Sequence, residues 1–442
     1  MDQTLKTAPI APTLKQAFWY WLKLGFISFG GPAGQIAIMH TDLVENKRWI
    51  SEKRFLHALN YCMVLPGPEA QQLATYIGWL MHKTRGGLLA GGLFVLPSLL
   101  ILMVLSTIYM RFGNTQIVSA VLYGIKPAVV AIVLFAACRI GSRALKNKAL
   151  WVIALASFLA ITLLQLPFPL IVISAALIGY LGNRYAPKLF SGSGMHKYVD
   201  KHFGKAVIDD DTPTPTHAHF SWHGLVKFLV IGVMIWLLGM ALLTTIYDWN
   251  AVYTQMAWFF TKAALLTFGG AYAVLPYVYQ GAVTHYSWLT PTQMMDGLAL
   301  GETTPGPLIM VVAFVGFVGG WSHAAAYSPL MTAIIAACVV TFFTFLPSFI
   351  FIFMGAPFIE STKNNLKLTA PLTAITAAVV GVIVALALFF ALHVFWLNHI
   401  QIDWLALLAA ALGFVALIQF KVNTMRLIGA FALFGLLKTW LL

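Results

Sequence analysis

Charged residues are scarce in this chain. Only 9% of its 442 residues are Asp, Glu, Lys or Arg, whereas 60% are hydrophobic, and the mean hydropathy is +0.84. So few charges cannot cover a water-soluble surface, which excludes a soluble globular protein and predicts an all-α polytopic membrane protein. Acidic residues are rarer still, with 14 against 27 basic ones. Because the basic residues cluster in short loops between apolar stretches, they indicate membrane topology and not nucleic-acid binding.

Several signatures of chemistry are also missing. The cysteines form no CxxC or Cys/His motif, and no Walker A, HEXXH or nucleophile-elbow pattern occurs. We therefore expect no enzyme activity, no cofactor and no metal. The first 15 residues lack the apolar core and cleavage site of a secretory signal, so we expect the helices themselves to direct insertion. Three isolated cysteines are predicted to be buried structural thiols: Cys62, Cys138 and Cys338.

What the chain does contain is an internal repeat. Phe29-Gly30-Gly31 recurs as Phe268-Gly269-Gly270, and Pro66-Gly67-Pro68 recurs as Pro305-Gly306-Pro307. Both offsets are 239 residues (268 − 29 and 305 − 66), and after a gap Leu96-Pro97-Ser98 is echoed by Leu346-Pro347-Ser348. A duplicated hydrophobic chain interrupted by Gly and Pro is typical of a secondary transporter whose site lies between two repeats.

The repeat divides the chain into five regions. We expect a cytoplasmic N-terminal tail (1–13), an N-terminal transporter repeat (14–183), a cytoplasmic linker (184–223), a connecting transmembrane helix (224–246) and a C-terminal transporter repeat (252–442). The linker is polar, with Gly-Ser, Asp and Thr-Pro runs, and is predicted to be flexible. Its histidines are interpreted as part of this solvated segment and not as a metal site: His217, His219 and His223.

The positions of Lys and Arg predict the orientation of the chain. Loops rich in these residues are expected in the cytoplasm, and loops without them on the outer face. This assignment requires the broken elements of each half to be re-entrant hairpins, whereas thirteen full crossings would leave the cations of 41–54 outside. In either case the connecting helix inverts the second repeat about an axis in the membrane plane. The predicted cytoplasmic loops are 41–54, 82–86, 139–148, 358–368 and 420–427, and the outer ones are 164–167, 246–255, 284–291, 321–328 and 394–403.

The Gly and Pro breaks form the predicted substrate site. Irregular backbone at membrane depth is tolerated only where protein or a watery cavity satisfies it, so four matched breaks should meet at the midplane. Pro68 and Pro307 suit the first turn of a helix, whose next amides attract anions. Paired glycines permit close approach of a ligand, with helix packing as the alternative. The candidate residues are Gly30, Gly31, Pro66, Gly67, Pro68, Gln71, Gly269, Gly270, Pro305, Gly306 and Pro307.

Matched polar residues precede both glycine pairs. Lys23 and Lys262 lie seven residues before them (30 − 23 and 269 − 262), inside apolar runs. An ionisable residue there is expensive and functional by default, unless the side chain snorkels to the interface. Ser28 and Thr267 are predicted to donate hydroxyls to the same cationic site, with bonding to their own helices as the alternative.

Acidic residues lie beside both Pro-Gly-Pro motifs. Glu69 follows the first motif and Glu302 precedes the second. A buried carboxylate would compete with an anionic substrate unless protonated, so we predict that these residues couple transport to protons. The alternative is a carboxylate that satisfies helix-end amides or pairs with Lys. Lys126 and Asp296 are further candidates for a functional role.

The ordered and repeated motifs resemble the chromate ion transporter family in its long, two-domain form. The resemblance covers nearly the whole chain outside the first dozen residues and the linker. It implies an exporter of chromate in the bacterial inner membrane, driven by the membrane potential or a proton gradient and conferring chromate resistance. It is also similar to families in which sulfate competes. The matching stretches are Phe29-Gly30-Gly31-Pro32 through Gln35, Leu65-Pro66-Gly67-Pro68 with Gln71, Phe268-Gly269-Gly270-Ala271-Tyr272 and Thr304-Pro305-Gly306-Pro307.

Several functional alternatives stay open at the level of sequence. The expected partners are chromate or a sulfate-like oxyanion, protons, the lipid bilayer and a second copy of the chain in a homodimer. A sulfate carrier working in uptake is one alternative, and an anion channel with a filter of broken helices is another. A membrane-bound chromate reductase would need a flavin, haem or thiol centre, which the isolated cysteines and the missing dinucleotide fingerprint argue against.

Overall fold

The chain folds almost entirely into helices. The computed structural model describes residues 9–29, 31–190, 203–213, 215–268, 270–324, 328–361, 369–397 and 401–441. Within these ranges the only strands are β1 (Trp396–Leu397) and β2 (Gln401–Ile402), which pair antiparallel. Six described helices are long and apolar enough to cross a bilayer, namely α4, α5, α7, α9, α14 and α15. The predicted all-α polytopic membrane architecture is confirmed.

The helices of the N-terminal repeat differ widely in length. In chain order they are α1 (Leu14–Ile27), α2 (Gly31–His40), the π-helical η2 (Thr41–Asn46), α3 (Glu52–Cys62), α4 (Glu69–Phe112), α5 (Gln116–Ala144), α6 (Lys148–Thr162), α7 (Phe168–Tyr185) and α8 (Pro187–Phe190). Helix α4 is two arms joined at a kink, because His82 and Lys83 leave helical geometry. Gly78 and Gly86 let the arms approach closely, since a Cβ at Gly78 would lie 2.4 Å from the Gly86 carbonyl oxygen.

The second half repeats this order after a connecting helix. The elements are η3 (Thr216–Ala218), the connecting α9 (Trp222–Tyr247), α10 (Val252–Leu265), α11 (Ala271–Tyr279), the π-helical η4 (Gln280–His285), α12 (Pro291–Thr303), η5 (Leu308–Met310), α13 (Val311–Ser322), α14 (Pro329–Ser361), α15 (Thr369–Phe395), α16 (Trp404–Ile418) and α17 (Thr424–Leu441). Both ends of η4 follow those of η2 by 239 residues (280 − 41 and 285 − 46). The offset of the sequence motifs therefore also relates local backbone structure.

Side-chain caps fix where the short helices begin. Thr13 and Gln16 form a capping box at the start of α1. Ser51 caps α3, and Thr290, which follows it by 239 residues (290 − 51), forms a capping box with Gln293 at α12. An N-cap hydrogen bond contributes about 1 kcal/mol to helix stability. The repeat therefore conserves the start of the helix that leads into each Pro-Gly-Pro motif.

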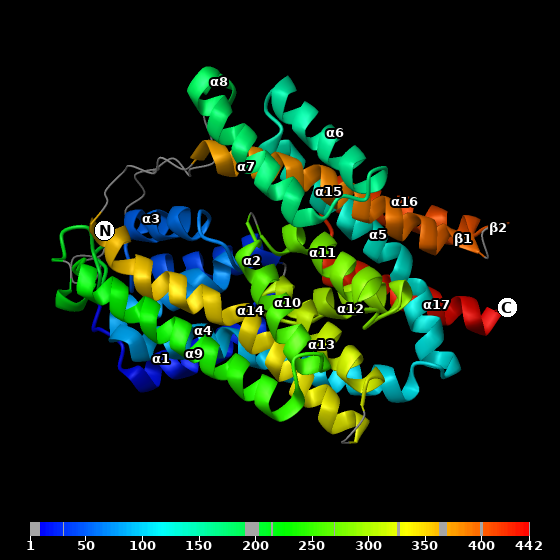
Figure 1. Ribbon diagram of the computed structural model, residues 1–442, viewed down its shortest axis with the longest axis horizontal. Coiled ribbons are helices and arrows are strands. Elements are labelled where there is room, and N and C mark those ends of the chain that lie inside the picture. Colours follow the sequence, from blue (N-terminus) through cyan, green and yellow to red (C-terminus); the bar gives the residue numbers. More distant parts are fainter. Residues whose placement is uncertain are drawn as a thin grey trace.

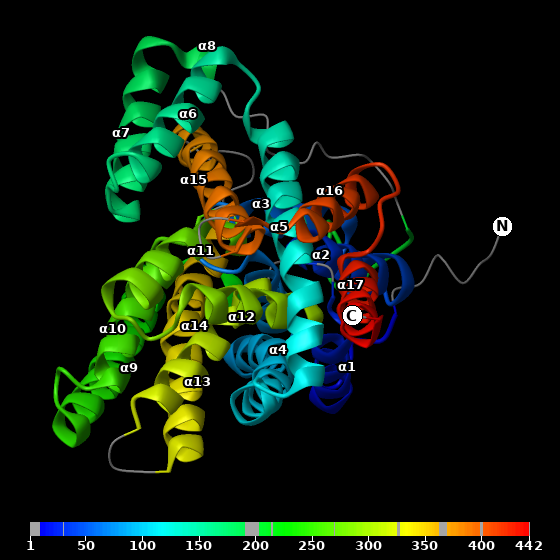
Figure 2. The same cartoon turned by 90° about the vertical axis from the view of Figure 1, so that its right-hand side faces the viewer.

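The two repeats exchange their long helices. Helix α5 packs against α16 and α17 of the other half, and α15 packs against α6 and α7. Figures 1 and 2 show α17 beside α5 and show α6 and α7 beside α15. These helices touch through glycine: a Cβ at Gly435 would lie 2.1 Å from the Ala120 carbonyl oxygen, and one at Gly381 would lie 1.9 Å from that of Ala154. The halves are interlocked and are not two separate bodies.

Two of the cysteines are not buried. Cys62 lies in the core, as the sequence predicts, whereas Cys138 and Cys338 are exposed on the protein surface. The prediction of buried thiols is wrong for these two residues. An apolar stretch in a membrane protein can face lipid as well as protein, so apolar neighbours in sequence do not imply burial by the fold.

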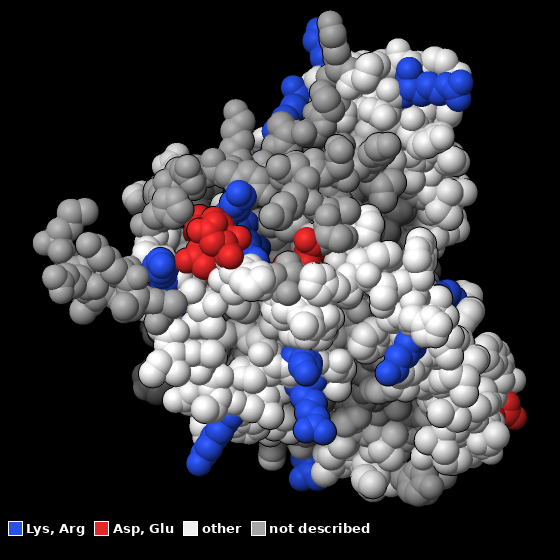
Figure 3. Space-filling view, turned by 90° about the vertical axis from the view of Figure 1, so that its left-hand side faces the viewer, with Lys and Arg blue, Asp and Glu red and all other residues white. Residues whose placement is uncertain are grey.

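Part of the linker is folded against the N-terminal repeat. The Ser51 amide donates to the Ile208 carbonyl at 3.0 Å, and its hydroxyl donates to Asp210 at 2.6 Å. The Arg54 guanidinium donates to the Thr212 carbonyl at 2.6 Å. The sequence predicts a flexible linker, but its carbonyls and Asp side chains anchor this part to the basic 41–54 loop. Figure 3 faces this end of the molecule, where acidic atoms gather beside basic ones.

Further contacts join this end to other loops. The His82 ring lies 2.8 Å from the Pro12 carbonyl oxygen. The Arg54 side chain also pairs with Glu360, at the end of α14, at 3.3 Å. The His217 ring lies 3.1 Å from the carbonyl oxygen of Trp79 in the first arm of α4. Segments that the basic residues assign to one membrane face thus meet at one end of the structure.

Candidate functional site

The helices break at all four Gly and Pro motifs. Helix α1 ends before the first glycine pair and α10 before the second, while each Pro-Gly-Pro separates a short helix from the next element. The described glycines in these breaks have φ values of 70° at Gly31, 128° at Gly67, 98° at Gly270 and 99° at Gly306. Glycine adopts this region without the penalty that a Cβ imposes. The motifs therefore specify the backbone turns themselves.

The Pro-Gly-Pro loop of each repeat pairs with the glycine break of the other. The Gly67 amide donates to the Thr267 carbonyl at 2.7 Å, and the Gly306 amide donates to the Ser28 carbonyl at 2.8 Å. Both partners are related by the repeat offset of 239 residues (267 − 28 and 306 − 67). Reciprocal contacts of this kind characterise a two-fold related interface. The breaks are thus joined in two equivalent pairs; Gly30 and Gly269 themselves lie outside the described residues.

Glutamine side chains support the same backbone. Gln35 is 1% exposed, and its amide nitrogen donates to the Gly306 carbonyl and, at 3.3 Å, to that of Ser28. The Gln72 amide donates to the Pro66 carbonyl at 2.8 Å. Gln71, a predicted binding residue, instead donates to the Thr75 hydroxyl at 3.0 Å within its own helix. Gln72 was absent from the predicted set, although it follows the same motif.

The two predicted hydroxyls differ in their surroundings. Thr267 donates to the Ala263 carbonyl of its own helix at 2.7 Å, which is the alternative that the sequence left open. The Ser28 hydroxyl is buried and has no hydrogen-bond partner among the described residues. The Ser28 hydroxyl is therefore available to a ligand or water, whereas that of Thr267 already donates to the protein.

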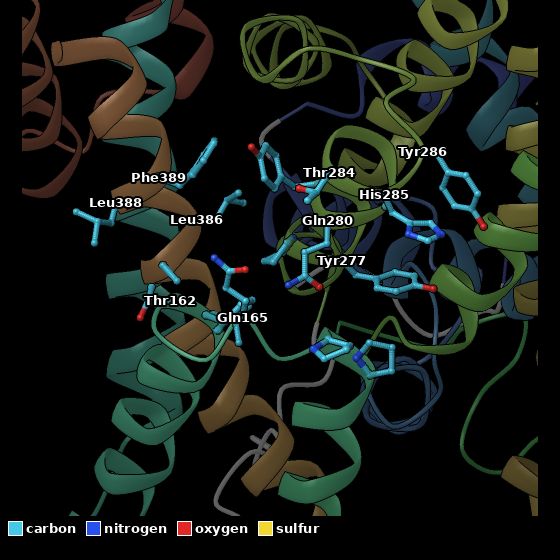
Figure 4. Close-up of a pocket in the computed structure, with 18 of the residues that line it drawn as sticks. Thr162, Gln165, Tyr277, Gln280, Thr284, His285, Tyr286, Leu386, Leu388 and Phe389 are labelled. Carbon is cyan, nitrogen blue, oxygen red and sulfur yellow. The ribbon is translucent and has the colours of Figure 1, made fainter. Parts of the chain in front are cut away.

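The two predicted lysines line separate cavities. Lys262 lines a cavity of about 680 Å³, and Figure 4 shows the polar groups Gln165, Gln280 and His285 among its lining residues. Aromatic and aliphatic side chains form most of the remaining wall. This cavity reaches the 164–167 and 284–291 loops, which lack Lys and Arg.

Lys23 occupies the equivalent place in the other repeat. It lines a cavity of about 720 Å³ together with Asp42, Asn46, Lys47 and Trp49. Three members of this set recur in the Lys262 cavity at the repeat offset, since Lys23, Asn46 and Lys47 correspond to Lys262, His285 and Tyr286. At about 1.5 Å per helical residue, Lys23 lies roughly 7.5 Å along the chain from Ser28. The structure therefore brings together the backbone breaks but places one lysine in each of two cavities.

The predicted acidic pair is asymmetric. Glu69 begins α4 directly after Pro68 and is partly exposed, with no partner among the described residues. Glu302 accepts a hydrogen bond from the Tyr272 hydroxyl of α11. Tyr272 thus connects the second glycine break to the helix that leads into the second Pro-Gly-Pro motif.

Lys126 and Asp296 form an ion pair between the repeats. Their closest nitrogen and oxygen atoms lie 4.0 Å apart, and Tyr109 donates to the other Asp296 oxygen at 2.9 Å. The contact joins α5 and α4 to α12. Asp296 corresponds to His57 in the first repeat (296 − 239), whose ring lies 3.0 Å from the Ile359 carbonyl oxygen. The charged member of this contact is therefore present in only one half.

The fold and the crossed breaks define a polytopic membrane protein of two related halves. The chain belongs to the chromate transporter family, whose signature matches residues 15–180 and 254–436, one region in each repeat. Among curated relatives, a chromate transport protein of Pseudomonas aeruginosa is 33% identical over 86% of this chain and 82% of its own length. Chromate transport proteins of Cupriavidus metallidurans and, described as probable, of Synechococcus elongatus are each 30% identical over 86% of this chain, covering 83% and 85% of their lengths. No solved structure gives a significant match.

Proposed function

We propose that this chain is a secondary active transporter that exports chromate, a tetrahedral oxyanion, across the bacterial inner membrane. Export would be driven by the membrane potential or a proton gradient and would confer chromate resistance. The family and the named activity of the relatives support the substrate class. The observation that carries the transport mechanism is the reciprocal pairing of Gly67 with Thr267 and of Gly306 with Ser28. It links the halves by their irregular backbone, where transporters bind substrate.

The substrate path begins at the cavities. Lys23 and Lys262 each attract the anion at one mouth of the protein, and the dehydrated ion then reaches the breaks. There the amides beyond Pro68 and Pro307 and the Ser28 hydroxyl replace part of its hydration shell, as fixed dipoles do in other anion sites. The remaining proposed contacts come from Gly30, Gly31, Pro66, Gly67, Gln71, Thr267, Gly269, Gly270, Pro305 and Gly306.

The two cavities open to opposite sides of the membrane in this account. The Lys23 cavity borders the basic 41–54 loop, which the distribution of basic residues assigns to the cytoplasm together with the N-terminus and the linker. The Lys262 cavity borders loops without Lys or Arg, which suits the outer face. The repeats are then inverted about an axis in the membrane plane, and rocking of one half exposes each mouth in turn. A homodimer would keep this path within each copy of the chain.

Proton coupling is assigned to Glu69 and Glu302. Both lie beside Pro-Gly-Pro motifs, where a carboxylate must be protonated or displaced when an anion arrives. The Tyr272 hydroxyl that donates to Glu302 favours its ionised form. Movement of α11 relative to α12 would break this bond and promote proton uptake. Binding and release of the oxyanion thereby become linked to proton exchange.

The proposal is tested by uptake of labelled chromate into inverted membrane vesicles energised by respiration, with and without excess sulfate and a protonophore. Energised chromate export requires saturable uptake that the protonophore abolishes, and competition by sulfate measures selectivity. Saturable uptake of sulfate alone identifies a sulfate carrier. Continuous, unsaturated flux identifies an anion channel.

A further inference from the structure

Two serines outside the predicted site lie directly against the crossed breaks. Ser98 in α4 and Ser348 in α14 each follow a proline inside a long helix. They are 0% and 1% exposed. A Cβ at Gly306 would lie 2.8 Å from the Ser98 Cβ and 3.2 Å from its hydroxyl, and a Cβ at Gly67 would lie 2.3 Å from the Ser348 hydroxyl. Each serine thus touches the Pro-Gly-Pro glycine of the opposite repeat.

Neither serine hydroxyl is satisfied by the protein. The described residues offer no hydrogen-bond partner to the Ser98 or Ser348 hydroxyl. Threonines of the same helices behave differently, because Thr107 donates to the Met103 carbonyl and Thr344 to the Val340 carbonyl, both at 2.7 Å. A buried hydroxyl without a partner destabilises a fold. Retaining two of them at repeat-related contacts points to a group that is bound during the transport cycle.

The surroundings favour an anion as that group. The Ser348 hydroxyl lies at the glycine just before α4, whose first amides have no partner within the helix and form a positive helix end. The Ser28 hydroxyl, also without a partner among the described residues, bonds through its carbonyl to Gly306, the glycine that Ser98 touches. Hydroxyls and amides can donate to an oxyanion without carrying charge of their own, and both lysines line other cavities.

We infer that Ser98 and Ser348 are oxyanion-binding residues, one from each repeat, which donate their hydroxyls to a tetrahedral dianion of the chromate or sulfate type. This inference rests on the proposed transport function and adds the side chains that set its specificity. The opposed serines give the site the same two-fold relation as the backbone pairing. Because the lysines line separate cavities, the ion would be attracted by charge at the mouths but selected by neutral donors at the breaks.

The test measures binding of chromate, and separately of sulfate, to the purified full-length protein by calorimetry and by thermal unfolding. The variants are Ser98→Ala, Ser348→Ala and the double substitution. Ser106→Ala is the matched control, because Ser106 is also buried in α4, has no hydroxyl partner among the described residues and does not contact either glycine. Each single alanine variant should raise Kd about tenfold or more, as expected for one hydrogen bond to a charged group, and the double variant should raise it about 100-fold.

The unfolding temperature of the ligand-free protein separates binding from a structural role. Removing an unsatisfied buried hydroxyl should leave this temperature unchanged or raise it, while the shift caused by chromate becomes smaller. Wild-type Kd in Ser98→Ala and Ser348→Ala, with wild-type protein that binds chromate or sulfate, overturns this inference alone. Loss of ligand-free stability in both variants assigns the serines a structural role and also overturns it. Wild-type protein that binds neither oxyanion overturns the proposed function as well.

Discussion

The backbone amide of Gly67 donates to the carbonyl of Thr267 at 2.7 Å, and the repeat-related pair, Gly306 and Ser28, makes the same bond at 2.8 Å. Each bond joins a Pro-Gly-Pro loop to the glycine break of the other half. A shift of one repeat against the other must therefore alter both bonds together. This shared dependence suits a protein that has to expose one site alternately to two sides.

Replacing either loop glycine should disrupt the crossing. Gly67→Ala and Gly306→Ala place a Cβ at φ values of 128° and 99° and within 2.8 Å of a serine. The left-handed backbone alone costs about 1–2 kcal/mol. We expect both variants to lose most transport and to unfold at lower temperature. Gly92→Ala, at a position in α4 where a Cβ meets nothing within 4 Å, is the control, and a loss equal to that of Gly92→Ala would contradict the role of the loops.

The lysines should act separately, each from its own side. Lys23→Ala should raise KM about three- to tenfold when oxyanion is supplied at the cytoplasmic face, and Lys262→Ala when it is supplied outside, because one partly exposed charge contributes about 1 kcal/mol of attraction. Both effects should shrink at high salt, and Lys→Arg should restore KM. Lys227→Ala, an exposed lysine of α9, controls for net charge. Wild-type transport by a folded double variant would refute the cationic mouths.

Repeat-related positions should face opposite sides of the membrane. Asn46 and His285 differ by the repeat offset (285 − 46 = 239) and line the Lys23 and Lys262 cavities. In a background without Cys62, Cys138 and Cys338, Asn46→Cys should react with a membrane-impermeant maleimide only in inverted vesicles. His285→Cys should react only in intact cells. Labelling of both from one side would rule out inverted repeats.

Docking of the linker should weaken in acid. Burial lowers the pKa of His217 below its ordinary value of 6.5, so the released segment binds a proton more readily than the docked one. Docking is therefore favoured above pH 6.5 and is progressively lost as the pH falls below that value. Hydrogen exchange of residues 203–213 should accelerate at low pH in wild type but not in His217→Gln. His219→Gln, which changes an exposed histidine of the same segment, should retain the pH dependence; identical behaviour of the two variants would exclude His217 as the cause.

The sequence predicts those features that depend on local backbone rules. The offset of 239 residues identifies the breaks, because Gly at positive φ and Pro at helix starts leave a readable signature. It also implies the matching π-helical segments, although nothing in their composition predicts that geometry. The contact between opposite motifs is different, since Gly67 and Thr267 are far apart in sequence and no local preference pairs them.

Side-chain placement was the least predictable part of the site. Lys23 and Lys262 stand out by charge, yet the fold places them in separate cavities. Ser98 and Ser348 have no such signal beyond the repeated Leu-Pro-Ser, because a serine in an apolar helix usually bonds to its own backbone. Anchoring of residues 203–213 was also hidden, since a polar composition describes solvent exposure but not the carbonyls of the Arg54 region that it meets.

The central claim is that this single chain carries a tetrahedral oxyanion by alternating access. It is tested most directly by counterflow with purified protein in liposomes loaded with unlabelled chromate and diluted into a trace of labelled chromate. The account predicts transient accumulation of label above its equilibrium level, saturable with chromate and abolished in Gly67→Ala and Gly306→Ala. Protein-dependent flux without such accumulation, or no flux from correctly inserted wild-type protein, would contradict it.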